Sequence, residues 1–144
     1  MSSELTLAEI SDRLLIHDLL VLYATALDAR DWDRVRSVFT EDAVLDYSMF
    51  GGPRGSVDEA LGWMSKALAR VPMTQHLITN VLIHLGSDTA EVTSAVFNPL
   101  GTESEVILVG GAYRDRVERT NRGWLIAERR AEFSWSNQPI KRRD

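Results

Sequence analysis

Apolar residues follow two different periods along this chain. In its first half they recur at helical spacing over residues 7–27, 32–39 and 57–71. Thr6 and Ser56 each stand three residues before a glutamate, which is the spacing of a capping box at the start of a helix. The first half therefore predicts three helices, the first long and mostly buried.

From residue 74 onward the period changes to two. The alternation predicts long strands over 74–85, 90–97, 105–118 and 124–135, joined by hairpin connections, and a short strand over 43–47 lies between the helices. Helices followed by an antiparallel meander are typical of an α+β domain in which helices pack on one face of a curved sheet. We expect the bend at Gly110-Gly111, because paired glycines inside a strand mark bulges.

Composition narrows the organisation and the partners. No repeat, low-complexity segment or linker divides the 144 residues, so we expect one domain over 1–144. The 16 basic and 21 acidic residues give a net charge of -5, which argues against a nucleic-acid partner. No signal-like start and no apolar run of about 20 residues is present, so we expect a cytoplasmic protein without a membrane partner.

Several kinds of site are excluded. The chain has no cysteine, which removes disulfides, thiolate zinc sites, iron-sulfur clusters and cysteine nucleophiles. His76 and His84 are eight residues apart on one predicted strand, about 26 Å, and so cannot share a metal. Metalloprotease, serine hydrolase, phosphate-loop and dinucleotide motifs are missing as well. We therefore expect neither a metal nor a cofactor.

One pair of residues could carry chemistry. His76 begins an otherwise apolar strand and shares a face with Asn80 and Leu82, at the mouth of the expected hollow. Asp28 follows the apolar end of the first helix, where the helix dipole and apolar surroundings oppose its ionisation. A histidine partner would create an Asp-His dyad whose free ring nitrogen is a base. Asp28 would equally suit a plain turn after the helix.

The motifs taken together resemble a known family. In order and spacing they are similar to the SnoaL-like, scytalone-dehydratase-like branch of the nuclear transport factor 2-like superfamily, over essentially the whole chain. The resemblance implies a cone-shaped, mixed and mostly antiparallel sheet with N-terminal helices on its concave face, enclosing a deep pocket. The residues that carry it are Tyr23-Ala24-x-Ala26-Leu27-Asp28-x-Arg30-Asp31-Trp32, Phe39-x-x-Asp42-Ala43, His76, Asn80, Gly110-Gly111-x-Tyr113, Arg119 and Gly123-Trp124.

The resemblance also implies a chemistry. In the bile-acid 7-alpha-dehydratases and hexachlorocyclohexane dehydrochlorinases of this branch, an Asp-His dyad removes a carbon-bound proton, and water or chloride leaves. The matching residues here are Asp28 and His76, with Tyr23 as the assisting tyrosine. Arg129 matches the arginine of the last strand. Its neighbour Arg130 points to the opposite face, and a register shift of one residue would exchange their roles. Either arginine would equally suit a structural pairing with acidic residues of a strand or of a partner subunit. The second catalytic histidine of scytalone dehydratase has no counterpart in the later strands.

These expectations define a candidate lyase. We expect a cofactor-independent dehydratase or dehydrohalogenase for a small hydrophobic, cyclic substrate, with His76 as general base and Asp28 as its orienting carboxylate. Tyr23 would donate a hydrogen bond to a substrate oxygen, and Arg129 would anchor an anionic group. An isomerase or cyclase of steroid or polyketide type needs the same dyad. A different class is a non-catalytic binding module, like the small subunits of ring-hydroxylating dioxygenases. The two classes differ in whether Asp28 and His76 meet inside a pocket.

Further side chains are expected around the ligand. Tyr47, Asn80 and Tyr113 are candidate polar contacts. The apolar wall, which would equally suit a plain core, is expected from Met49, Phe50, Trp63 and Phe97.

Two structural expectations accompany this site. Tyr23 and Asp28 would lie about 140° apart on a regular helix, so a shared role requires the helix to loosen before Asp28. The uncovered sheet face, with the apolar run 106–109, predicts a homo-oligomer, either a dimer or a trimer.

Overall fold

Both predicted capping boxes form, and each begins a helix. The computed structural model describes residues 3–139. The Thr6 hydroxyl accepts a hydrogen bond from the Glu9 amide, and the Glu9 carboxylate accepts one from the Thr6 amide, at the start of α1 (Leu7–Asp28). Ser56 and Glu59 repeat this arrangement at the start of α3 (Val57–Leu68). The short α2 (Trp32–Ser37) lies between them and is capped by Asp31.

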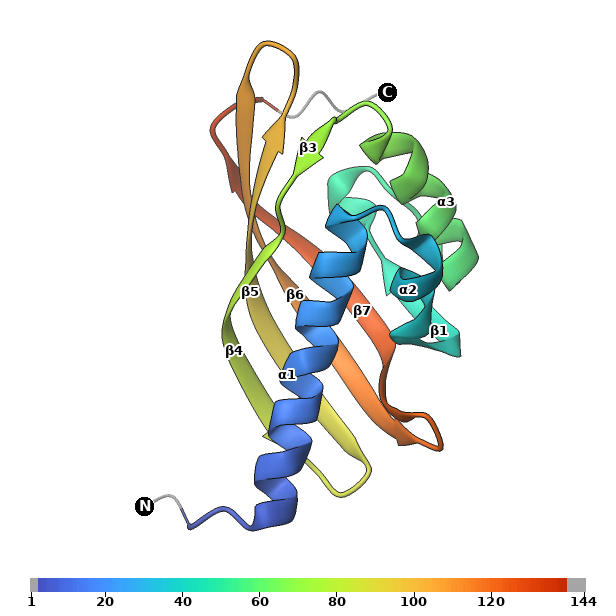
Figure 1. Ribbon diagram of the computed structural model, residues 1–144, viewed down its shortest axis with the longest axis vertical. Coiled ribbons are helices and arrows are strands. Elements are labelled where there is room, and N and C mark those ends of the chain that lie inside the picture. Colours follow the sequence, from blue (N-terminus) through green and yellow to red (C-terminus); the bar gives the residue numbers. More distant parts are fainter. Residues whose placement is uncertain (1–2, 140–144) are drawn as a thin grey trace.

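The strands form one curled sheet, and the helices pack on one face of it (Figure 1). The order is β2-β1-β7-β6-β5-β3, and β4 pairs with β5 beside β3. β1 and β7 run parallel and the other pairs are antiparallel, so the predicted mixed, mostly antiparallel α+β cone is confirmed. The elements are β1 (Phe39–Asp46), a 3-10 turn η1 (Ser48–Phe50), β2 (Arg54–Gly55), β3 (Met73–Thr74), β4 (Leu77–Leu85), β5 (Thr89–Gly101), β6 (Val106–Thr120) and β7 (Gly123–Ser136).

The glycine pair in β6 marks an irregularity, as expected. The register between β6 and β7 shifts between Gly110 and Gly111. A Cβ atom at Gly111 would lie 2.3 Å from the Glu132 carbonyl oxygen on β7. Only glycine permits this close approach of two backbones.

β5 is longer than the sequence predicts. Residues 98–101, which we expected to form a hairpin connection, continue the strand, and the turn lies at Thr102–Glu105, where the Thr102 amide donates to the Glu105 carbonyl. Pro99 is tolerated inside the strand because it lies beside the link between β3 and β4, where it accepts from the Gln75 amide and no donor is required of it. The proline therefore does not end the strand.

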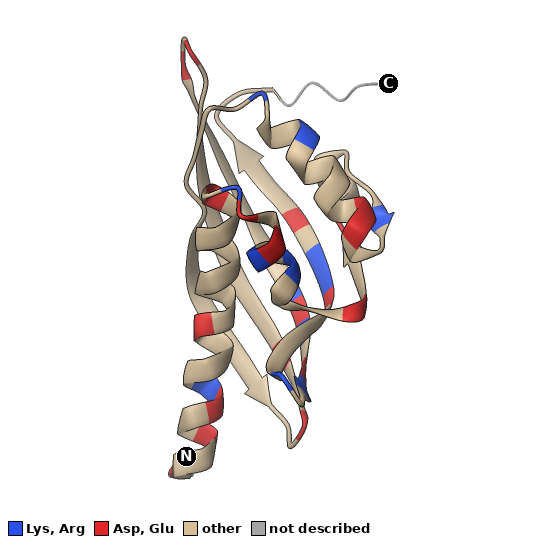
Figure 2. Ribbon diagram, turned by 45° about the vertical axis from the view of Figure 1, so that its right-hand side comes forward, with Lys and Arg blue, Asp and Glu red and all other residues tan. Residues whose placement is uncertain are grey.

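The first half of α1 is fixed to the far end of the sheet by polar contacts. The Arg119 guanidinium donates to both carboxylate oxygens of Asp12, at 3.0 and 2.8 Å, and the Trp124 indole donates to the same carboxylate at 2.9 Å. At the other end of the sheet, away from Arg119 and Trp124, β4, β5 and β6 carry few charged residues (Figure 2). Within residues 3–139, no helix is both long and apolar enough to cross a membrane.

Candidate active site

A cavity of about 130 Å³ lies between α1, α3 and the concave face of the sheet. Most of its wall is apolar, and includes Leu27, Phe50, Trp63, Met64, Val96 and Leu100. Its polar groups are three tyrosines, one histidine and one asparagine, namely Tyr23, Tyr47, Tyr113, His76 and Asn98. Such a cavity suits a small, mainly hydrophobic molecule held by a few polar contacts.

The expected contact between Asp28 and His76 is present. His76 Nδ1 lies 2.6 Å from Asp28 Oδ1, and the His76 backbone amide donates to Asp28 Oδ2 at 2.8 Å. Asp28 is the last residue of α1, and His76 lies in the link between β3 and β4. The two side chains are 24% and 8% exposed, and the ring of His76 lines the cavity. The Asp28 carboxylate thus contacts Nδ1 of the ring, while the ring itself borders the cavity.

Two residues to which the sequence analysis gave no role in the site support the carboxylate. The Thr74 hydroxyl donates to Asp28 Oδ1 at 3.0 Å and accepts from Arg30 Nη1 at 2.8 Å. Arg30 also donates to the carbonyls of Leu27 and Val71, at 3.1 and 2.9 Å, and so joins the end of α1 to the segment before β3. Its backbone has a positive φ of 59°, a strained conformation for a residue with a side chain.

Burial and hydrogen bonding act on Asp28 in opposite directions. Burial raises the pKa of this carboxyl, as its apolar surroundings suggested. Hydrogen bonds from the His76 side chain and backbone, the attraction of the ring and the bond from Thr74 lower it, and together they outweigh burial. The pKa of Asp28 therefore lies below its usual value, and the carboxylate is ionised near neutral pH.

The tyrosines form a second polar group in the cavity. The hydroxyls of Tyr23 and Tyr47 are 2.7 Å apart, and the rings of Tyr23 and Tyr113 meet edge to face at 5.8 Å. Burial raises the pKa of Tyr47 and of Tyr113 well above the usual value of 10.0. Both phenols therefore stay protonated and can donate a hydrogen bond to a bound molecule.

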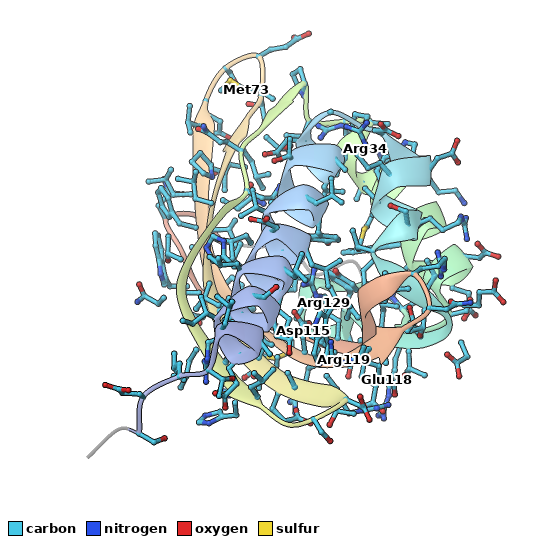
Figure 3. All side chains as sticks on the ribbon, turned by 60° about the horizontal axis from the view of Figure 1, so that its bottom comes forward. Arg34, Met73, Asp115, Glu118, Arg119 and Arg129 are labelled. Atoms are coloured by element: carbon cyan, nitrogen blue, oxygen red, sulfur yellow. The ribbon has the colours of Figure 1, made fainter. Side chains whose placement is uncertain are left out.

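Arg129 does not line the cavity, which corrects its expected place as an anion anchor. Its fully buried guanidinium donates to both oxygens of Asp115, at 2.8 and 2.7 Å (Figure 3). The rings of Tyr23 and Tyr113 cover it, with centroids 4.2 and 4.0 Å from its central carbon. Its charge is satisfied by Asp115 and shielded by the tyrosines. Arg130 points to the exposed face, as the alternation predicts.

Three other residues expected around the ligand do not line the cavity. Phe97 stacks on Trp135 on the opposite face of the sheet, because its neighbours Val96 and Asn98 point into the cavity. Met49 lies in η1 outside the cavity and is 44% exposed. Asn80 is exposed and has a positive φ of 50°, at a register shift in β4 that breaks the expected alternation. Four expected residues do line the cavity, namely Tyr47, Phe50, Trp63 and Tyr113.

The helix does not loosen before Asp28. α1 is continuous from Leu7 to Asp28, so Tyr23 and Asp28 point in different directions. The two are nevertheless joined in one site, because the ring of His76 extends from Asp28 into the cavity that Tyr23 lines. The expectation overlooked that the histidine spans this gap.

Asn98 is the functional candidate that the sequence analysis missed. Its Nδ2 lies 3.0 Å from Nε2 of His76, on the side of the ring opposite Asp28. The alternation along β5 would have found it, had the strand been extended past Phe97.

Within residues 3–139, no group of three or more histidine, cysteine, aspartate or glutamate side chains is arranged to hold a metal ion.

Comparison with known proteins places the chain in a family. The SnoaL-like domain model matches residues 8–130. The uncharacterized protein Rv2910c from Mycobacterium tuberculosis is 39% identical over 130 residues, which cover 88% of each chain. A solved structure from Novosphingobium aromaticivorans, named provisionally as an aromatic ring hydroxylase, is 32% identical with a TM-score of 0.80, covering 88% of this chain and 91% of its own.

A more distant neighbour has a more specific name. The hexachlorocyclohexane dehydrochlorinase LinA-type3 from Novosphingobium barchaimii is 20% identical with a TM-score of 0.77, over 92% of each chain. At this identity the likeness shows the fold. Taken with the matched residues 8–130, these comparisons show that the chain belongs to the SnoaL-like domain family.

Proposed function

We propose that this protein is a cofactor-independent lyase that eliminates water or a halide from a small hydrophobic, cyclic substrate. The observation that carries the proposal is the Asp28–His76 contact of 2.6 Å, with the imidazole directed into an apolar cavity. An ionised carboxylate on Nδ1 fixes that nitrogen as the N–H and leaves Nε2 as the base. The same carboxylate stabilises the imidazolium that forms when the base accepts a proton.

The elimination can be written with these groups. Nε2 of His76 takes a proton from a substrate carbon, and the electrons of that C–H bond form the new double bond. The leaving group departs from the neighbouring carbon with its bonding pair, as chloride, or as water once it has received the proton now on Nε2. One hydroxyl of the Tyr23–Tyr47 pair donates to the other, and the remaining O–H would donate to an oxygen of the substrate as charge develops on it.

The size and lining of the cavity support the substrate class. About 130 Å³ of mainly apolar space suits a compact ring rather than a long chain or a highly charged molecule. Structural neighbours named provisionally as a scytalone dehydratase, and as a hexachlorocyclohexane dehydrochlorinase, share this fold and are consistent with elimination chemistry. Their names guide the choice of compounds for the test.

Activity measurements on two compound sets test the proposal. Chloride release would be followed with chlorinated cyclohexanes, and loss of water with cyclic β-hydroxy ketones, through the absorbance of the enone product. We expect turnover in one set, with His76→Ala and Asp28→Asn lowering kcat by about 100-fold or more. Tyr23→Phe should cost less, because Tyr47 and water can replace one donor.

A matched control separates the dyad from general effects of the substitutions. His84 is exposed on β4, away from the cavity, so His84→Ala should retain full activity. Full turnover by His76→Ala would show that the dyad is not the base. A product with a moved double bond and no lost group would identify an isomerase instead.

A further inference from the structure

The imidazole of His76 has a hydrogen-bond partner at both nitrogens. Asp28 Oδ1 lies 2.6 Å from Nδ1, and Asn98 Nδ2 lies 3.0 Å from Nε2. An ionised carboxylate accepts only, and an amide NH₂ donates only. With the amide in this orientation, the pair of partners matches a ring with its proton on Nδ1 and its lone pair on Nε2.

The other half of the Asn98 amide is free. Asn98 Oδ1 is buried against the cavity and has no hydrogen-bond partner within the described residues. Turning the amide by half a rotation would exchange Oδ1 and Nδ2, and would place an acceptor against Nε2. That arrangement fits only a ring that carries a proton on Nε2. The two orientations of one side chain thus match the two protonation states of the base.

Resting on the proposed function, we propose that Asn98 is a positioning residue that sets the protonation state of His76. Before substrate binds, its NH₂ group donates to Nε2 and holds the neutral, Nδ1–H form. A substrate C–H takes the place of that donor when it approaches Nε2. After proton transfer, the free Oδ1 can accept from the new N–H of the imidazolium.

The position of Asn98 in the sheet explains why its amide lies beside the ring of His76. Asn98 lies on β5 one residue after Phe97, which pairs with Leu77, the residue that follows His76. Pro99 is its other neighbour along β5, and the link between β3 and β4 runs beside it. The Asn98 amide therefore belongs to the long strand β5, whereas the His76 ring that it contacts belongs to the short link between β3 and β4.

Other titratable groups near the ring leave this assignment intact. Asp28 reaches it from α1, and Arg30 contacts Thr74 rather than the ring. The cavity phenols come from α1, from the end of β1 and from β6, and burial raises the pKa of Tyr47 and Tyr113 well above neutral pH. Asp28 is the sole carboxylate within hydrogen-bond distance of the ring among the described residues.

Nitrogen NMR of the histidine rings tests the proposal without any substrate. The chain has three histidines, so the His76 signals can be assigned by comparison with His76→Ala. We expect the wild-type ring at neutral pH to show a protonated Nδ1 and an unprotonated, hydrogen-bonded Nε2. Asn98→Leu should move the Nε2 signal toward that of a nitrogen without a hydrogen bond. An unchanged Nε2 signal in this variant, or a protonated Nε2 in the wild type, would overturn the proposal.

A second variant reverses the chemistry of the partner. Asn98→Asp puts a second carboxylate against Nε2, so both ring nitrogens should be protonated at neutral pH. The acid side of the kcat/KM profile should move up by about one pH unit, a loss of about tenfold on the steep part of the profile. Asn121→Asp, with the same charge change in the exposed turn after β6, should leave both readouts unchanged. Expected ring signals without turnover would contradict the lyase and leave the role of Asn98 intact.

Discussion

At the scale of single residues, opposing effects on the pKa of Asp28 lead to a test of the site. Its pKa lies below the usual value because hydrogen bonds from His76 and Thr74 outweigh burial. A carboxyl with a lowered folded pKa stabilises the fold above its unfolded pKa of about 3.9, and this contribution is lost as pH falls through the folded value. We therefore expect Asp28→Asn to flatten the acid side of the stability profile.

Urea unfolding between pH 2.5 and pH 7 measures this effect. The free energy of unfolding of the wild type should fall more steeply below pH 4 than that of Asp28→Asn. Asp18 is exposed on the same helix, and Asp18→Asn serves as the control that should keep the wild-type slope. Equal acid slopes in wild type and Asp28→Asn would show that these hydrogen bonds do not favour ionisation of the carboxyl.

The dyad could be predicted from sequence, but its supports could not. Asp28 and His76 stand out because a charged or titratable side chain next to apolar residues needs a partner. Thr74 and Asn98 are ordinary polar residues of a strand, and their roles depend on which atoms of neighbouring segments meet. Arg30 acts through a positive φ and through carbonyls that only the folded chain brings together. These contacts follow from register, which a single sequence leaves open.

At the scale of elements, the capping-box predictions succeeded because their signal is local. A capping box depends on two residues three apart, and both boxes formed as expected. The predicted alternation failed along β4, where one extra residue shifts the register against β5. The irregularity near Asn80 turned Leu82 outward and placed Val81 and Ile83 against the core. After a one-residue shift, every later side chain points to the opposite face of the sheet. An alternation followed from one end of the strand therefore assigns these side chains to the wrong face.

Two glycines provide a matched test of the element scale. A Cβ atom at Gly111 would meet the Glu132 carbonyl at 2.3 Å, so Gly111→Ala should destabilise the protein by roughly 1–3 kcal/mol. Gly62 lies inside α3, and nothing lies within 4 Å of an added Cβ. Gly62→Ala should therefore stabilise the protein by roughly 0.5–1 kcal/mol, through better helix propensity. Chemical denaturation of both variants measures the difference, and a neutral Gly111→Ala would contradict the close backbone approach.

At the scale of the whole molecule, the curl of the sheet separates its two faces. The concave face and α1 enclose the cavity, while the convex face carries an apolar row. Leu77, Phe97 and Trp135 lie in register across β4, β5 and β7, with Gly110 of β6 between the last two. The run 106–109 divides between the faces, since Val106 is exposed and Val109 lines the cavity. We expected the whole run to lie on the uncovered face, and this is correct at Val106 but not at Val109.

This apolar row is the feature on which we base a prediction of self-association. Leu77 and Trp135 are 40% and 47% exposed, and contiguous apolar surface of this kind is favourably covered by a second copy. Light scattering at micromolar concentration should give a particle of two or three times 16.2 kDa. The double variant Leu77→Glu and Trp135→Glu should reduce it to one chain, because burying the introduced charges is unfavourable. Leu14→Glu on the exposed side of α1 should leave the mass unchanged, and a wild-type particle of 16.2 kDa would contradict the prediction.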